Sequence, residues 1–198
     1  MSTRSVSSQK RLQKELLVLL KTPFVDPDIL LRPSVATSLL SWTALLKGPC
    51  DSPYKGGVYQ LDITCPSDYP LSPPSMKFVT KIFHPNVAFL TGEICLDILK
   101  NQWSPAWSLT SSCRAVLSLL TDPNDDSPLN CDAGNMVRAK DWEAHDSVAR
   151  MYVVENAMVL RWPEEGEGME KEKEKEKEKE EKQSKGGKGR KVAPAPAA

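Results

Sequence analysis

Apolar residues recur at helical spacing near the start of the chain and again in its second half. Over residues 5–20 four leucines are predicted to share one helix face, with basic residues off that face. These leucines are Leu12, Leu16, Leu19 and Leu20. The spacing returns from Leu109 to Leu120, and we expect a last helix over about 136–161. Its inward residues are predicted to be Val148, Met151 and Tyr152.

Between these helices the pattern changes to short strand-like segments separated by turns. Residues 58–65 alternate, with Tyr59, Leu61 and Ile63 on one face and polar residues on the other. Further strands are predicted at 29–31, 39–47 and 76–79, with proline and glycine turns between several of them. Short connections favour an antiparallel meander. The order of elements predicts an α+β fold: an N-terminal helix, a four-stranded meander, a long loop and C-terminal helices.

The end of the chain differs from the rest in composition. Residues 163–198 contain 10 acidic and 10 basic residues, and Glu and Lys alternate over 170–180. A segment this charged and this poor in apolar residues cannot bury a core. We therefore predict a folded domain over 1–162 and a disordered, low-complexity tail over 163–198, with a docking or regulatory tail as the alternative.

Charge and cysteine usage exclude several classes of protein. The 26 basic residues equal the 26 acidic ones, so neither nucleic acid nor an anionic membrane is favoured as the main partner. The apolar run Leu16–Leu20 is far shorter than the about 20 residues of a transmembrane helix, so we expect no direct membrane span. Five cysteines without a C-x-x-C pair, with only two histidines, favour free thiols in the cytoplasm and predict no metal site.

The segment 81–107 has no clear periodicity, and a loop this long in a compact domain is usually either functional or a misassigned element. It contains Cys95, and His84 lies upstream, so a nucleophilic cysteine is one interpretation. A Cys–His hydrolase, which would release its acyl group to water, would need His84 or His145 as its base. The proline after His84 favours an extended, structural histidine. We expect His145 at the surface of its helix.

Four phrases of the sequence match, in order, the core of a known enzyme family. They are Tyr69-Pro70-Leu71-Ser72-Pro73-Pro74, His84-Pro85-Asn86, Gly92-Glu93-Ile94-Cys95-Leu96-Asp97-Ile98-Leu99 and Trp103-Ser104-Pro105-Ala106-Trp107. Over about residues 5–155 the chain resembles the ubiquitin-conjugating (E2) enzymes. It is most similar to the peroxisomal E2s, the peroxins of import-receptor recycling, through Thr80-Lys81-Ile82-Phe83 and Ser127-Pro128-Leu129-Asn130-Cys131-Asp132. The nine-position separation of Asn86 and Cys95 fits the same subfamily.

The resemblance implies an active site that needs no metal or organic cofactor. Cys95 is expected to accept ubiquitin as a thioester and pass it to a lysine or a cysteine. Asn86 is expected to stabilise the oxyanion or to hold the active-site loop. The supporting residues are expected to be His84, Asp97, Asp126 and Ser127. Many lysine-modifying members carry an Asp where this chain has Ser127; an Asp helps to deprotonate an amine, so a thiol acceptor is one hypothesis.

The resemblance also implies binding surfaces and partners. The surface that RING-type ligases contact corresponds to Leu71, Pro105, Ala106 and Trp107. The side that meets the ATP-dependent ubiquitin-activating enzyme corresponds to Lys10, Arg11 and Lys14, where basic residues steer encounter; the alternative is that all three simply face solvent. A membrane-anchoring peroxin is expected to recruit the chain to the cytosolic face of the peroxisome, with the import receptor as substrate. An E2 for another ubiquitin-like modifier and a catalytically idle ubiquitin-binding adaptor are the alternatives.

Overall fold

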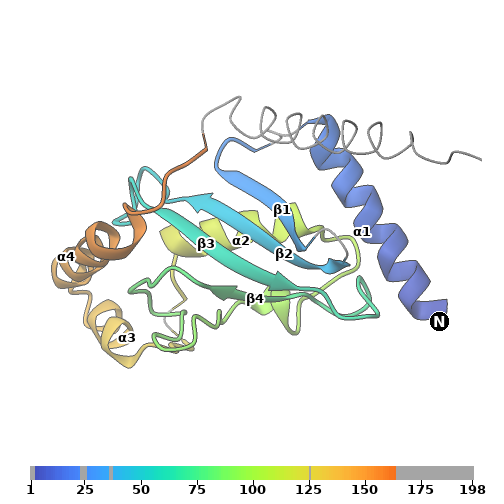
Figure 1. Ribbon diagram of the computed structural model, residues 1–198. Helices are drawn as coiled ribbons and strands as arrows, with labels where there is room; N and C mark the ends of the chain where they lie inside the picture. The colour runs from blue at the N-terminus through green and yellow to red at the C-terminus, as the bar shows by residue number, and fades with distance from the viewer. Residues whose placement is uncertain (1–2, 23–25, 36–37, 125, 164–198) are drawn as a thin grey trace, which may run out of the picture. The chain divides into compact units, whose positions relative to one another are not determined.

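A computed structural model describes residues 3–22, 26–35, 38–124 and 126–163 (Figure 1). The elements are, in chain order, α1 (Thr3–Lys21), β1 (Ile29–Val35), β2 (Ser38–Lys47), β3 (Val58–Thr64), β4 (Ser75–Phe78), the 3-10 helix η1 (Asp97–Leu99), α2 (Leu109–Thr121), α3 (Cys131–Arg138), α4 (Trp142–Tyr152) and the π-helical turn η2 (Val153–Ala157). This order is the predicted α+β arrangement. The predicted tail, from residue 164 on, lies outside the described residues, and the predicted domain boundary stays a prediction.

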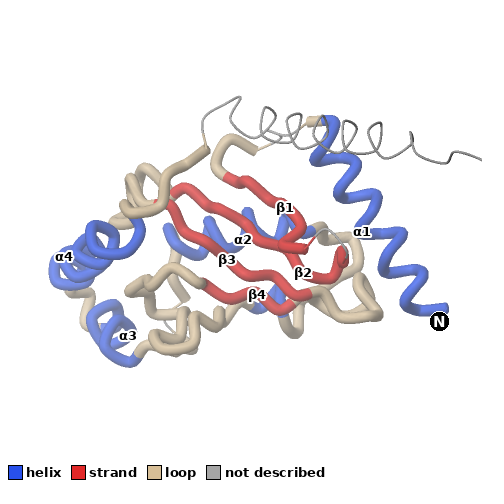
Figure 2. The backbone as a smooth tube through the Cα atoms, viewed as in Figure 1, coloured by secondary structure: helices blue, strands red, loops and turns tan. Residues whose placement is uncertain are grey.

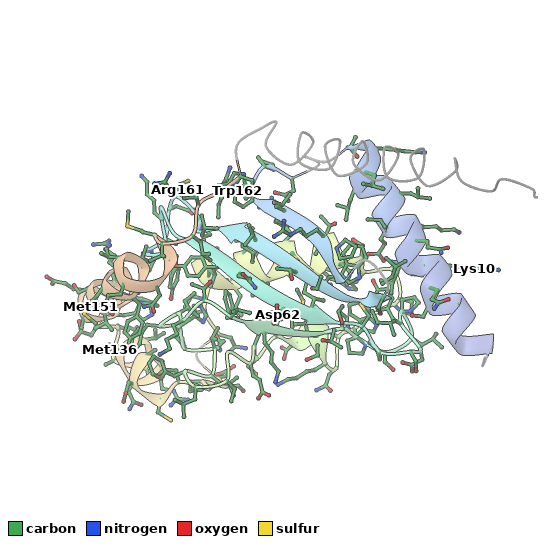
Figure 3. All side chains as sticks on the ribbon, in the orientation of Figure 1. Lys10, Asp62, Met136, Met151, Arg161 and Trp162 are labelled. Atoms are coloured by element: carbon green, nitrogen blue, oxygen red, sulfur yellow. The ribbon has the colours of Figure 1, made fainter. Side chains whose placement is uncertain are left out.

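The four strands form one antiparallel sheet in the order β1-β2-β3-β4, as the short turns predicted. Apolar and polar residues alternate along β3, and this alternation determines how β3 pairs with β2 and β4. Trp42 of β2 pairs with Ile63 of β3, which pairs with Met76 of β4, and all three side chains are buried on one face. Asp62, the neighbour of Ile63, lies on the opposite face, which α2 does not cover (Figure 3).

Helix α2 crosses the apolar face of the sheet (Figure 2). It begins at a reciprocal cap: the Ser108 hydroxyl accepts from the Ser111 amide (3.1 Å), and the Ser111 hydroxyl accepts from the Ser108 amide (2.8 Å). Its predicted apolar face is buried, including Val116 and Leu120. Burial of each such side chain contributes about 1.5–3 kcal/mol. This packing fixes the start of α2, and therefore the end of the segment 81–107 that precedes it.

The C-terminal half differs from the predicted single helix. The chain leaves α3 through Lys140, which has a φ of 58°, and Asp141 caps the start of α4, because its carboxylate accepts from the Ala144 amide (3.1 Å). A left-handed residue followed by a new cap ends one helix and starts another. Met151, predicted inward, is exposed, because the buried side of α4 follows His145, Ala149 and Val153.

Two further predictions about individual side chains are wrong. Leu20, predicted on the buried face of α1, is 64% exposed, because the side of this helix that packs on the core runs through buried Leu12 and partly buried Leu16 and Leu19. His145, predicted at the surface, is 3% exposed, because α4 turns it onto Phe83, with ring centroids 5.9 Å apart. Within the described part of the chain, no helix is both long enough and apolar enough to cross a membrane.

Candidate active site

A short hairpin brings Cys95 opposite Asn86. The Cys95 amide donates to the Asn86 carbonyl oxygen (2.8 Å), and Val87 and Ile94 form the next antiparallel bridge. Residues nine positions apart in sequence therefore lie side by side. The Cys95 side chain is half-buried, so its sulfur combines a fixed position with access from solvent.

Gly92 closes the turn of this hairpin. Its amide donates to the Ala88 carbonyl oxygen (2.8 Å), and its carbonyl accepts from the Phe78 amide of β4 (2.8 Å). Its φ is +70°, and a Cβ atom at this position would lie 2.0 Å from the Phe78 carbonyl oxygen. A left-handed backbone this close to a strand requires glycine. Gly92 therefore anchors the Cys95 hairpin to the sheet.

Asn86 is fully buried, and both ends of its amide are engaged by one residue. Its Nδ2 donates to the Asn124 carbonyl oxygen (2.6 Å), and its Oδ1 accepts from the Asn124 amide (2.9 Å). The Asn124 side chain in turn accepts from the Asp126 amide (2.9 Å). Of the two roles expected for Asn86, this geometry favours holding the loop that starts after α2.

The same loop is held at its far end by the backbone of Pro85. The Pro85 carbonyl oxygen accepts from the amides of Leu129 (2.8 Å) and Asn130 (3.0 Å). Between the two attachments lie Asp126 and Ser127, both exposed. The tripeptide His84-Pro85-Asn86 thus connects the Cys95 hairpin to the two residues expected to face an acceptor.

His84 supports this arrangement from the interior, as the following proline predicted. Its Nε2 lies 2.9 Å from the Leu119 carbonyl oxygen, and its Nδ1 accepts from the Asn86 amide (3.0 Å). A carbonyl only accepts and an amide only donates, so the ring is neutral with its proton on Nε2. Burial, with a smaller contribution from His145, lowers the pKa of His84 to about 3, although the Leu119 carbonyl opposes the shift. A histidine held neutral with both nitrogens occupied is a structural residue.

This lowered pKa predicts how stability depends on pH. An unfolded histidine titrates near pH 6.5, whereas folded His84 stays neutral down to about pH 3. Below pH 6.5 the unfolded state therefore binds one more proton, and the free energy of unfolding falls as pH falls. The expected slope from His84 is about 1.4 kcal/mol per pH unit between about pH 6 and pH 4.

Urea titrations of the wild type and of His84→Gln across this range measure the slope. Glutamine offers a donor and an acceptor but does not titrate, so the variant is expected to lack this part of the slope while the carboxylates contribute equally to both proteins. Equal slopes in the two proteins would contradict the assignment. Imidazole nitrogen shifts in the wild type check it independently, because the Nε2–H tautomer is expected to persist at pH 5.

Lys100 is a site residue that the sequence analysis missed. Its Nζ lies 3.4 Å from the Cys95 sulfur and donates to it. The 3-10 turn η1 places it there, because the Asp97 carbonyl accepts from the Lys100 amide (3.0 Å) and the Gln102 amide (2.9 Å). Asp97 itself is exposed. Lys100 can be paired with Cys95 only if this turn is known, and the periodicity of the sequence does not predict the turn.

The residues predicted to contact a ligase lie on two adjoining loops. Leu71 is 67% exposed on the first loop. Pro105 and Ala106 are exposed on the second, where Trp107 is half-buried. The Trp103 indole joins the two loops by donating to the Pro70 carbonyl oxygen (2.9 Å). The structure therefore brings these predicted residues to one surface.

The three basic residues predicted on α1 do not share one environment. Lys10 and Lys14 are exposed, and Lys10 projects from α1 away from the sheet (Figure 3). Arg11 is partly buried and donates to the carbonyl oxygens of Pro105 (3.1 Å) and Trp107 (2.8 Å). The alternative of three solvent-facing residues is wrong for Arg11.

The other cysteines differ from Cys95 in position and burial. Cys65 and Cys113 are buried, and burial raises the pKa of each thiol to about 12, so neither is a nucleophile near neutral pH. Cys50 and Cys131 are exposed and lie outside the hairpin. Across the part of the chain that the structure describes, no group of three or more His, Cys, Asp or Glu side chains is placed to hold a metal ion.

Comparison with known proteins agrees with this geometry. The family profile described as "Ubiquitin-conjugating enzyme" matches residues 11–153. The chain belongs to the ubiquitin-conjugating enzyme family, and its fold is the one that this family shares. Both predictions drawn from the resemblance, the fold and the E2 class, are confirmed. The roles of the individual site residues stay predictions.

Individual relatives show which kind of ubiquitin-conjugating enzyme this chain is most similar to. Protein PEROXIN-4 of Arabidopsis thaliana is 54% identical over 146 residues, which cover 74% of this chain and 92% of that protein. Ubiquitin-conjugating enzyme E2 pex4 of Dictyostelium discoideum is 56% identical over 142 residues, which cover 72% and 94%. H. polymorpha Pex4p, solved in complex with the soluble domain of Pex22p, superimposes with a TM-score of 0.72 at 36% identity, covering 76% and 98%. The chain is an E2 of the Pex4 type.

Proposed function

We propose that Cys95 carries the thioester in this ubiquitin-conjugating enzyme and that the chain works at the cytosolic face of the peroxisome. The observation that most directly supports Cys95 as the thioester residue is the hairpin that holds it, half-buried, opposite Asn86. The Lys100 Nζ donates to its sulfur at 3.4 Å. In charging, the Cys95 thiolate attacks the carbonyl carbon that joins ubiquitin to the activating enzyme. A new C–S bond forms and the thiolate of the activating enzyme leaves.

Discharge reverses the role of Cys95. An acceptor amine or thiolate attacks the thioester carbonyl, the C–S bond breaks, and the Cys95 thiolate leaves. Lys100 is placed to stabilise this leaving thiolate, because its Nζ lies 3.4 Å from the sulfur. An amine acceptor must also lose a proton, whereas a thiolate acceptor need not. The neutral Ser127 beside the site therefore favours a cysteine acceptor unless a partner supplies a base.

The experiment that tests this function is a charging assay. The chain is incubated with ubiquitin-activating enzyme, ATP, Mg²⁺ and ubiquitin, and the products are separated with and without reductant. The expected result is a shift by one ubiquitin that reductant removes. No shift, when the same activating enzyme charges a control E2, would contradict the proposal. A shift only with another modifier and its own activating enzyme would identify that modifier instead, and no shift with any modifier would favour the adaptor.

The proposed partners follow from the surfaces and the relatives. RING-type ligases are expected at the surface formed by Leu71, Pro105, Ala106 and Trp107, with the peroxisomal import receptor as acceptor. The H. polymorpha relative was solved with the soluble domain of Pex22p, which supports a membrane-anchoring peroxin as a partner of this chain. In cells that lack the endogenous enzyme, import-receptor ubiquitination is expected to return with the wild type and not with a Cys95→Ala variant. No restoration by the wild type would contradict the substrate assignment, and restoration by Cys95→Ala would contradict the role of Cys95.

Replacing Ser127 by aspartate is expected to change acceptor preference. A carboxylate here would help to deprotonate an attacking amine, so discharge to free lysine should rise about tenfold, less than the about 10²–10⁴-fold of a fully positioned general base. Discharge to free cysteine should stay unchanged, because a thiolate needs less help. Single-turnover discharge of pre-charged enzyme measures both rates. Ser127→Asn, similar in size but without a base, is the matched control, and equal gains toward both acceptors would contradict the hypothesis.

A further inference from the structure

Arg11 connects α1 to the second ligase loop through two backbone carbonyls. Its Nη1 donates to the Pro105 oxygen (3.1 Å) and its Nη2 to the Trp107 oxygen (2.8 Å). These carbonyls lie two positions apart, on either side of Ala106. A planar guanidinium can satisfy both at once, which a lysine ammonium at the end of a flexible stem cannot do with the same geometry. The side chain therefore fixes the curvature of this loop from outside it.

Glu15, one turn further along α1, completes the attachment. Its Oε1 accepts from Arg11 Nε (2.6 Å), and its Oε2 accepts from the Leu109 amide (2.8 Å). Leu109 is the first residue of α2 and follows the loop directly. Its amide is one of the helix-terminal donors that need a partner outside the helix. The side chain of Glu15 is only 12% exposed, so this ion pair is partly shielded from water.

The same carboxylate also contacts the first ligase loop. The Tyr69 hydroxyl donates to Glu15 Oε1 (2.8 Å), and the Arg11 guanidinium carbon lies 5.9 Å from the centre of the Tyr69 ring. Burial, reinforced by the Glu15 carboxylate, raises the pKa of Tyr69, so its hydroxyl remains a donor. Two side chains of α1 thus hold both loops, with the Trp103 indole on Pro70 as a third connection between the loops.

We propose that Arg11 and Glu15 are positioning residues for the ligase surface. They hold the loops that carry Leu71 and Pro105-Ala106-Trp107 in the conformation that a RING domain contacts. Loops are the mobile parts of a scaffold, and a loop that is already ordered loses less conformational entropy on binding. This inference rests on the proposed function, because the ligase surface is itself part of that proposal.

The proposal separates Arg11 from its exposed neighbours on the same helix. Lys10 and Lys14 present charge to solvent and suit long-range attraction to the activating enzyme. Arg11 instead donates hydrogen bonds to Glu15, Pro105 and Trp107. Its main effect is therefore expected in ligase-stimulated transfer, whereas the resemblance placed it with the two lysines at the activating enzyme.

The test uses full-length enzyme already charged with ubiquitin, so the activating enzyme plays no part in the measured step. Discharge to free lysine is followed alone and with increasing amounts of a RING domain chosen because it stimulates the wild type. Arg11→Lys keeps the charge but loses the paired donors, and the ratio of stimulated to unstimulated discharge at sub-saturating RING is expected to fall about tenfold. Tyr69→Phe, which removes one hydroxyl, should lower the ratio less. Gln13→Ala, on the exposed side of α1, is the matched control and should behave like the wild type.

Amide hydrogen exchange provides the readout that distinguishes positioning from direct contact. In Arg11→Lys and in Glu15→Gln, exchange over residues 104–109 is expected to accelerate, while the hairpin 86–95 stays as protected as in the wild type. Reduced stimulation with unchanged exchange would show that Arg11 contacts the ligase itself and would overturn the proposal. A separate charging assay completes the test. Slower charging of Arg11→Lys with an intact stimulation ratio would also overturn the proposal, because Arg11 would then act toward the activating enzyme.

Two further outcomes keep the test decisive. If Arg11→Lys does not fold, as judged by its thermal midpoint, Tyr69→Phe replaces it, and an unchanged ratio together with unchanged exchange would overturn the proposal. If no RING domain stimulates the wild type, the ligase part of the proposed function fails. Exchange over 104–109 then shows separately whether α1 holds the loop, and unchanged exchange in the variants overturns the positioning role as well.

Discussion

Replacing Cys95 by serine is expected to convert the ubiquitin adduct from one that reductant removes into one of the same size that resists it. A serine hydroxyl at this position forms an oxygen ester with the ubiquitin carboxyl terminus, and thiols do not cleave esters readily. Because an alkoxide is a much poorer leaving group than a thiolate, discharge to lysine or cysteine should fall by at least about 10³-fold. Cys95→Ala should form no adduct. Gel separation with and without reductant measures charging, and single-turnover discharge measures transfer.

The other thiols of the chain supply the controls for this experiment. Cys50→Ser and Cys131→Ser remove the two exposed thiols outside the hairpin and should charge and discharge like the wild type. A reductant-sensitive adduct that persists in Cys95→Ala and disappears in Cys131→Ser would place the acceptor elsewhere. Since Cys65 and Cys113 are buried with raised pKa values, adducts on them are not expected in the folded protein.

The elements predicted well are those whose sequence pattern repeats. The alternation of β3 and the helical spacing of α2 each extend over enough residues to fix which face is buried, and short turns then leave the meander as the simplest topology. The break at Lys140 was missed because it depends on one left-handed residue and one cap, which a periodic pattern passes over. The burial of His145 was missed for a different reason, because it depends on the contact with Phe83, which lies far away in the sequence.

In the candidate site, too, residues within a distinctive sequence pattern were predicted, and residues that depend on contacts made by the fold were missed. The motif identified Cys95 and Asn86, because their neighbours in sequence are distinctive. Lys100 and Glu15 escaped notice because each acts through a partner that the fold brings near, Cys95 for the first and the start of α2 for the second. Arg11 was found, but its basic charge suggested attraction to a partner, whereas its contacts are with the loop at 105–107. A sequence shows which residues carry charge, but it does not show which atoms those charged groups contact in the folded protein.

Replacing Asn86 by alanine is expected to slow discharge by about 10²–10³-fold, a loss as large as that of an oxyanion-hole donor. The physical reason proposed here is the loop. Both polar atoms of the Asn86 side chain are bonded to the Asn124 backbone, and alanine would leave the Asn124 amide and carbonyl without these partners. Asn86→Asp keeps an acceptor for the Asn124 amide but places a carboxylate oxygen against the Asn124 carbonyl, so it should preserve only part of the attachment.

Discharge rates together with amide exchange distinguish the two roles of Asn86. If it holds the loop, exchange over residues 124–130 should accelerate in Asn86→Ala, and the loss of discharge should follow that acceleration across the variants. Asn124→Ala is the matched control, because it removes only the bond to the Asp126 amide and leaves both backbone partners of Asn86 in place. It should retain most activity. A large loss of discharge in Asn86→Ala with the loop as protected as in the wild type would contradict the holding role, and would mean that the amide leaves Asn124 to stabilise the oxyanion during transfer.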